Sequence, residues 1–232
     1  MVRSVHACNF ARTNRGRTRC PAAGVRWAIA LIALVAGCQP GGRTTAPRTR
    51  SLCGEAEAIA GSRAGAALEE RLGGTVAHAA ATDRMRAVER RLARGTPELR
   101  GAWQYRILAS DRVDAFSLPG GLIYITRGLY ERRIGNDNDL LAAALAHEMA
   151  HVIRKDSLKP ARGTAAEALE REMSADLCAA RYLQAAGYDA RCLTDLLRLI
   201  EDAQPPGWAE ARIRALGARP AKRAGSLAHS NP

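Results

Sequence analysis

The chain has 232 residues, of which 47% are hydrophobic and 25% charged, and its formal net charge is +12 at pH 7. This length is enough for one domain with a hydrophobic core. Residues 1–37 hold six arginines and no acidic residue, so residues 38–232 carry only +6 of this charge. This small excess of positive charge gives little support for binding to nucleic acid, and we expect no nucleic-acid partner.

The N-terminal segment has the pattern of a bacterial lipoprotein signal. A basic region is followed by a run of ten apolar residues, Trp27–Ala36, which is too short for a membrane-spanning helix of about 20 residues. The stretch Val35-Ala36-Gly37-Cys38 closes this run and resembles the lipobox, in which the cysteine receives lipid. We therefore expect a signal peptide over residues 1–37 and lipidation at Cys38. An ordinary secretory signal and a short signal anchor are the alternatives.

A lipid on Cys38 would anchor the protein to the bacterial cell envelope. Residues 38–53 are largely polar and contain Pro47, which is typical of a flexible linker between an anchor and a domain. The residue after the cysteine is Gln39 and not the Asp that favours retention in the inner membrane. We expect a lipid-anchored protein that faces the periplasm, with the outer membrane favoured over the inner.

Residues 54–217 are expected to form one mainly helical α+β domain, followed by a disordered tail over residues 218–232. Helical periodicity runs through 55–72 and 76–92, and His78 is interpreted as a helix-surface residue. Strands are expected over 103–109 and 112–118.

The next predicted strand follows a Pro119-Gly120-Gly121 turn and is β-branched and aromatic. Its residues are Leu122, Ile123, Tyr124, Ile125 and Thr126. The segment is short enough to lie at the exposed edge of a small antiparallel sheet, where a substrate peptide could add by main-chain hydrogen bonds. The alternative is a hairpin that only fills the core.

An apolar segment from Leu140 to Ile153 contains no Pro or Gly and follows four Asn and Asp residues, which predicts a helix that begins near residue 138. Within it, His147 and His151 are four apart on one helix face, so both imidazoles can reach one metal ion. Glu148 sits beside that face, where it can act as a general base toward water. The alternative is two histidines buried by chance, each of which would need a polar partner.

Catalytic zinc usually keeps three protein ligands, so a third ligand is expected downstream. A second predicted helix carries Glu172 and Asp176, which are four apart and share a face. One of these carboxylates can bind metal while the other orients a ligand histidine. Spacing alone does not assign the two roles. Glu170 is a further candidate, and an ordinary charged helix surface is the alternative.

Three segments together resemble the zinc metalloendopeptidases of the HtpX and CAAX-prenyl-protease type, a group that includes the periplasmic protease BepA and the mitochondrial protease Oma. These segments are the hairpin region Asp114–Leu129, the His-Glu-Met-Ala-His motif and the Glu-x-x-x-Asp helix, and their order and spacing agree over about residues 80–200. The resemblance implies a zincin-like fold with one zinc ion per chain. It assigns the metal ligands to His147, His151 and Glu172 and the catalytic base to Glu148.

The resemblance also assigns the supporting acid to Asp176 and the substrate-binding edge strand to residues 122–126. It aligns Arg212 with a family arginine that either pairs with Asp176 or stabilises charge at the reacting carbonyl. A solvated surface arginine is the ordinary alternative. In many members a histidine precedes the Glu-x-Arg-Ile stretch that contains this arginine. This chain has the stretch but lacks the histidine, so no role of that histidine can be transferred to it.

Cys178 and Cys192 lie on consecutive predicted helices, the second over residues 190–201. A helical hairpin can bring two such thiols within bridging distance, and an oxidising compartment permits the disulfide. Two separate buried thiols are the alternative. Cys53 would remain unpaired in either case.

These patterns predict a zinc-dependent endopeptidase that cleaves misfolded or misassembled envelope proteins, a substrate class that the resemblance alone implies. Its partners would be polypeptide substrates and, through the lipid anchor, the membrane. A zinc-binding but catalytically latent periplasmic chaperone or assembly factor is the alternative function. The intact Glu148 favours the enzyme, because a binding protein needs no general base.

Overall fold

The structure is a computed structural model that describes residues 54–159, 163–189 and 191–217. The expected signal peptide, the lipidation site Cys38, the linker 38–53 and the tail 218–232 lie outside these described residues, so their assignments stay predictions. Among the helices of the described ranges, none combines the length and apolar character that a membrane span requires.

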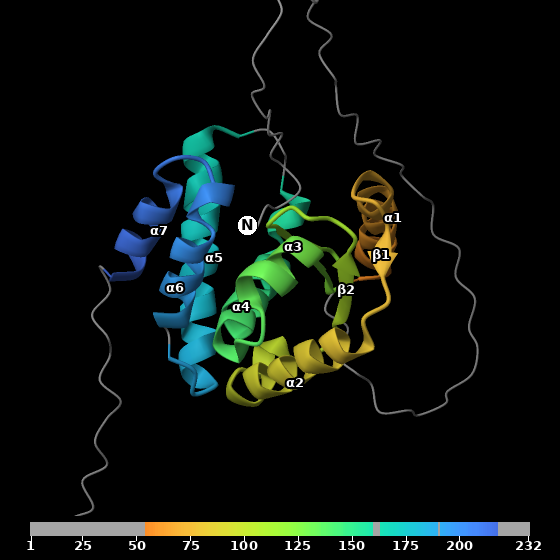
Figure 1. Cartoon of the computed structure of the whole chain (residues 1–232), viewed down its shortest axis with the longest axis horizontal. Coiled ribbons are helices and arrows are strands. Elements are labelled where there is room, and N and C mark those ends of the chain that lie inside the picture. The colour runs from red at the N-terminus through yellow and green to blue at the C-terminus, as the bar shows by residue number, and fades with distance from the viewer. Residues whose placement is uncertain (1–53, 160–162, 190, 218–232) are drawn as a thin grey trace, which may run out of the picture. The chain divides into compact units, whose positions relative to one another are not determined.

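The described chain is mainly helical with one small sheet, which confirms the expected α+β class (Figure 1). Its helices are α1 (Glu55–Arg71), α2 (Ala79–Gly95), α3 (Arg127–Leu129), α4 (Asn138–Ile153), α5 (Ala165–Ala185), α6 (Arg191–Leu199) and α7 (Trp208–Gly217). Its strands are β1 (Thr75–Val76), β2 (Gln104–Leu108), β3 (Ala115–Leu118) and β4 (Leu122–Thr126). Shorter turns of 3-10 or π helix lie at Pro97–Leu99, Tyr130–Ile134, Asp156–Leu158 and Glu201–Ala203.

The two N-terminal helices form close to where periodicity placed them. α2 begins three residues later than expected, because Thr75–Val76 pairs with β2 as strand β1. His78 is therefore not on the helix surface but at the N-cap of α2, where its Nδ1 accepts a hydrogen bond from the main-chain N–H of Ala81 at 3.2 Å.

The sheet is mixed, and its order is β1-β2-β4-β3. β4 pairs with β3 in antiparallel and with β2 in parallel orientation, so the expectation of an antiparallel sheet was wrong. The prediction that residues 122–126 form an exposed edge strand was also wrong, because β4 has a neighbouring strand on each side and all five of its residues are buried. A strand that is apolar at successive positions is typical of one covered on both faces. Among the described strands, β1 and β3 form the edges.

Helices cover both faces of the sheet (Figure 1). On one face Ala115, Ile123 and Ile125 join the main core with α2 and α4. On the other face Phe116 and Tyr124 pack against α1. α1 approaches closely because it has glycine where a side chain would collide: a Cβ at Gly61 would lie 1.9 Å from the main-chain oxygen of Pro119.

α4 occupies the centre of the described fold. It packs against α2, α5, α6 and the edge strand β3, and residues 141–152 are all buried. A helix that is apolar nearly all round is stable only inside a protein, and five of its buried residues are alanines that let neighbouring helices approach. The polar residues of α4 are thereby held between the sheet and α5.

Candidate metal centre

The N-terminus of α4 is fixed by a side-chain cap. Asp137 accepts hydrogen bonds from the main-chain N–H groups of Asp139 at 2.8 Å and Leu140 at 3.0 Å, which satisfies two amides that have no partner inside the helix. The helix then runs unbroken to Ile153, as expected. This continuity places His147 and His151 one turn apart, with ring centroids 4.6 Å from each other.

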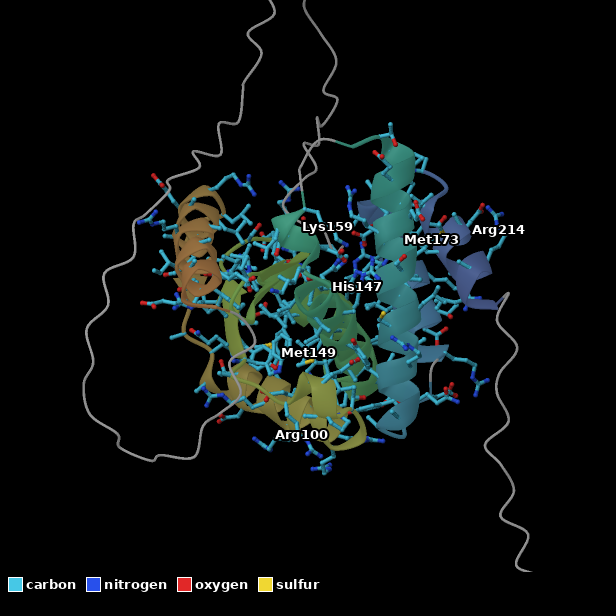
Figure 2. The ribbon with its side chains drawn as sticks, turned by 180° about the vertical axis from the view of Figure 1, so that it is seen from behind. Arg100, His147, Met149, Lys159, Met173 and Arg214 are labelled. Atoms are coloured by element: carbon cyan, nitrogen blue, oxygen red, sulfur yellow. The ribbon has the colours of Figure 1, made fainter. Side chains whose placement is uncertain are left out.

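α5 begins with a capping box, in which Thr164 and Glu167 bond to each other's main chain. The helix carries Glu172 and Asp176, both buried, on the side that faces α4. Figure 2 shows His147 on α4 close to α5, the helix that bears the labelled Met173. Glu170, the other acidic candidate, is exposed.

Three side chains converge at this helix pair and could hold a metal ion: His147, His151 and Glu172. The two Nε2 atoms are 3.0 Å apart, and the Glu172 carboxylate lies 3.3 Å from Nε2 of His147 and 3.5 Å from Nε2 of His151. Tetrahedral ligands about 2.0 to 2.1 Å from zinc are separated by about 3.3 to 3.4 Å. The donor set and its spacing therefore fit a zinc ion.

The second ring nitrogen of each histidine faces a carboxylate. Nδ1 of His147 lies 2.9 Å from Oδ1 of Asp176, and Nδ1 of His151 lies 3.0 Å from Oδ2 of Asp156. Histidines that bind metal commonly have such a partner behind the ring. Asp156 was absent from the residues expected in this site, because it lies beyond the end of α4 and reaches His151 only through the turn that follows.

Arg212 of α7 is 1% exposed, so the surface-arginine alternative does not hold. Its guanidinium donates to both oxygens of Asp176, at 2.7 Å and 2.8 Å, and Nη2 lies 3.6 Å from Glu172. Nη1 donates to Gln204 at 2.8 Å. Arg212 thus touches the acid behind His147 and borders the ligand cluster.

Several buried carboxyl groups surround the two imidazoles of the cluster. Burial lowers the pKa of His151, but Glu172 and Asp156 outweigh it and raise the value to about 10. Burial raises the pKa of Glu172, but His151 and His147 outweigh it and hold the value well below its ordinary range. For Asp156, burial is likewise outweighed, by hydrogen bonds from His151 and Lys159, and its pKa falls to about 2. Ionised carboxylates around one point favour a bound cation.

Glu148 has a different environment from the other acidic residues of the site. Burial is the largest influence on its carboxyl and raises its pKa, against the lowering effects of His147 and His151. Ser117 of β3 is close enough to lower this pKa as well, although neither carboxylate oxygen makes a hydrogen bond of ordinary geometry within the described chain. A carboxylate with a raised pKa and free lone pairs can accept a proton.

The possible disulfide between Cys178 and Cys192 is not formed. Cys178 on α5 and Cys192 on α6 are both free thiols. Cys192 is buried in the main core, whereas Sγ of Cys178 accepts a hydrogen bond from Arg181 at 3.3 Å. Cys178 is half-buried against the same core, and the two free thiols correspond to the alternative of separate cysteines.

Comparison with known proteins agrees with this site. Residues 79–170 match the family model of peptidase family M48, and this range contains His147, Glu148 and His151. It ends two residues before Glu172, the third member of the cluster. No curated protein matches the chain. The family match and the convergence of two histidines with Glu172 support a metallopeptidase of family M48.

Proposed function

We propose that the protein is a zinc-dependent endopeptidase that acts on misfolded or misassembled proteins of the bacterial cell envelope. One observation carries this proposal: two histidines and Glu172 present three ligand atoms to one point, and Glu148 lies on the same helix beside them. The raised pKa of the Glu148 carboxyl suits a group that takes up a proton during the reaction.

His147, His151 and Glu172 would hold the metal, and the carboxylates behind the two rings would keep both Nε2 atoms directed at it. A bound zinc ion would supply Lewis acidity toward the substrate carbonyl and lower the pKa of water. Glu148 would take the proton of the attacking water and deliver it to the leaving amine. Arg212 acts on this machinery through its contacts with Asp176 and Glu172.

The strand that presents the substrate would be β3 and not β4. β3 pairs only with β4 among the described strands and packs against α4. The main-chain N–H of Thr126 donates to the oxygen of Asp114, so the bonded pairs alternate from there along the ladder. Ala115 and Ser117 therefore direct their main-chain groups away from β4. Both residues are buried in this structure, so this edge would have to open before an extended peptide adds to it.

The envelope location and the polypeptide partners remain part of the proposal. The location rests on the lipobox at Cys38 and on Gln39 after it, which favour an outer-membrane lipoprotein whose domain faces the periplasm. The substrate class rests on the family resemblance. A single fatty chain binds a membrane reversibly, so the multiple acylation typical of lipoproteins would supply the stable anchor.

The test is to measure zinc content and casein cleavage on one preparation of the detergent-solubilised protein, with Glu148→Gln as the matched control. We expect about one zinc ion per chain in both proteins and cleavage only in the wild type, because the amide keeps the shape of the side chain but cannot accept a proton. Zinc without cleavage in the wild type would favour the latent chaperone. A wild-type protein that binds no zinc would overturn the proposal.

A further inference from the structure

We infer that Asp156 is a positioning residue of the metal centre, which holds the ring of His151 so that its Nε2 atom faces the metal. Asp156 belongs neither to the His-Glu-Met-Ala-His motif nor to the Glu-x-x-x-Asp helix. The inference rests on the proposed metal site and adds to it a second carboxylate, the counterpart of Asp176 behind His147.

The contact between Asp156 and His151 is short and shielded from water. Oδ2 of Asp156 lies 3.0 Å from Nδ1 of His151, and both side chains are at most 2% exposed. The opposite ring nitrogen of His151 lies 3.0 Å from Nε2 of His147 and 3.5 Å from Glu172. The imidazole is therefore held between the carboxylate on one side and the ligand cluster on the other.

The chain makes a specific turn to bring Asp156 to this position. A helix that continued through residue 156 would place that residue roughly 140° around the axis from His151, on another face. Instead α4 ends at Ile153, and Lys155 adopts the left-handed conformation with φ 55° and ψ 35°. Lys155 is the only non-glycine residue with positive φ in the described ranges. Because lysine disfavours this region, the surrounding structure must hold it there.

Two cations keep the carboxylate of Asp156 ionised and oriented. Nε of Arg154 lies 3.0 Å from Oδ2, and Nζ of Lys159, labelled in Figure 2, bonds to Oδ1. An ionised carboxylate only accepts hydrogen bonds, so the Nδ1 atom that faces it carries the proton. In the neutral imidazole the lone pair is then on Nε2, the atom that lies among the other ligand atoms.

A purely structural role is the competing explanation, since Asp156 also links the end of α4 to the turn after it. The two roles predict different losses. A structural residue changes the stability of the metal-free protein, whereas a positioning residue changes the affinity for metal and the geometry of the bound ion. Metal affinity and a spectroscopic signature therefore separate them.

The experiment uses the full-length protein in detergent, stripped of metal and titrated with zinc against a chromophoric chelator. Asp156→Asn keeps an oxygen that can accept from Nδ1 but loses the charge, and we expect about 10-fold weaker zinc binding. Asp156→Ala loses both, and we expect up to about 100-fold weaker binding. Asp195→Asn is the matched control: this exposed aspartate pairs with Arg198 on α6, and its variant should bind zinc like the wild type.

Cobalt substitution supplies the second readout, because the visible absorption of bound Co²⁺ reports coordination geometry. We expect altered bands in both Asp156 variants and unaltered bands in Asp195→Asn. Wild-type affinity and wild-type cobalt bands in Asp156→Ala would overturn the inference, whatever the change in melting temperature. If Asp156→Ala fails to fold, the isosteric Asp156→Asn variant decides by the same criteria. A wild type that binds no metal, or a His147→Ala variant that binds as tightly as the wild type, would instead overturn the proposed site itself.

Discussion

Arg212 of α7 donates two hydrogen bonds to the carboxylate of Asp176 on α5, from Nε at 2.7 Å and from Nη2 at 2.8 Å. The pair is 1% exposed on both sides, and Asp176 in turn contacts His147. A helix near the C-terminal end of the described chain is thus linked, through a buried charge pair with Asp176, to α4 and its two histidines.

Removing the arginine should therefore destabilise the fold strongly. Arg212→Ala leaves the buried Asp176 without its cation, and the free energy of unfolding should fall by about 3–5 kcal/mol in urea titrations. Arg212→Lys should recover only part of this loss, because an ammonium cannot make the two parallel bonds of a guanidinium. Arg198→Ala, at an exposed site on α6, is the control and should change stability by less than about 1 kcal/mol. An equal effect at both positions would contradict the prediction.

The local elements of this protein could be predicted because their signals are local. The cap before α4, the absence of Pro and Gly within it and the four-residue spacing of His147 and His151 all act within one helix. The same holds for Glu172 and Asp176 on α5. That these two helices pack against each other was implied by the shared metal chemistry and by the family resemblance, since no local pattern encodes it.

The predictions that were wrong or incomplete concern contacts between segments that are distant in the sequence. The position of β4 inside the sheet depends on its parallel pairing with β2, whose first residue is eighteen positions away, and strand propensity carries no information about neighbours. The near-continuous apolar run Leu122–Ile125 was a signal for an internal strand. Asp156 was missed because its role depends on a left-handed lysine, which sequence rarely discloses. For Arg212 the surface alternative stayed open, because its burial depends on its pairing with Asp176, which lies far away in the sequence.

The identity of the third metal ligand can be tested by a matched pair of variants on α5. Glu172→Ala should lower zinc occupancy in the purified protein, because a three-ligand site loses much of its binding free energy with any one ligand. Glu170→Ala should leave occupancy unchanged, since Glu170 is exposed and two residues away on the helix. His147→Ala and His151→Ala should behave like Glu172→Ala. Full zinc occupancy in Glu172→Ala would show that another group completes the site.

The lipid anchor is tested at Cys38. Cys38→Ser should abolish labelling of the protein by a palmitate analogue and move it from the membrane fraction to the soluble fraction of the envelope. Glu148→Gln serves as a control, because it should be labelled and fractionated like the wild type. Labelling that persists in Cys38→Ser would show that the lipobox assignment is wrong.

The close contact of α1 with the β3–β4 turn makes a further stability prediction. Alanine at Gly61 would place a Cβ 1.9 Å from the main-chain oxygen of Pro119, so the helix or the turn must shift. Gly61→Ala should destabilise the protein by about 1–3 kcal/mol in urea unfolding, although alanine is the better helix former by about 1 kcal/mol. Ser62→Ala changes an exposed neighbour on the same helix and should be close to neutral. A stabilised Gly61→Ala would mean that α1 does not pack here.

The proposal that β3 presents the substrate is tested by proline at adjacent positions of the strand. Phe116 faces Tyr124 in the ladder and Ser117 faces Ile123, and the alternation that starts at Asp114 makes Phe116 the bonded position. Proline removes the main-chain N–H. Phe116→Pro should therefore break the bond to β4 and lower the melting temperature. Ser117→Pro should leave the ladder intact but remove a donor that a bound peptide needs.

For Ser117→Pro we expect zinc content near that of the wild type and casein cleavage reduced by at least about 10-fold, which corresponds to one lost hydrogen bond of about 1.4 kcal/mol in the transition state. Ser117→Ala is the essential control, because the hydroxyl also acts on Glu148. If cleavage depends on the main-chain donor, the alanine variant retains most of its activity while the proline variant loses it. Equal losses in the two variants would assign the effect to the hydroxyl, and a folded, fully active Ser117→Pro would show that substrate does not pair with β3 at this position.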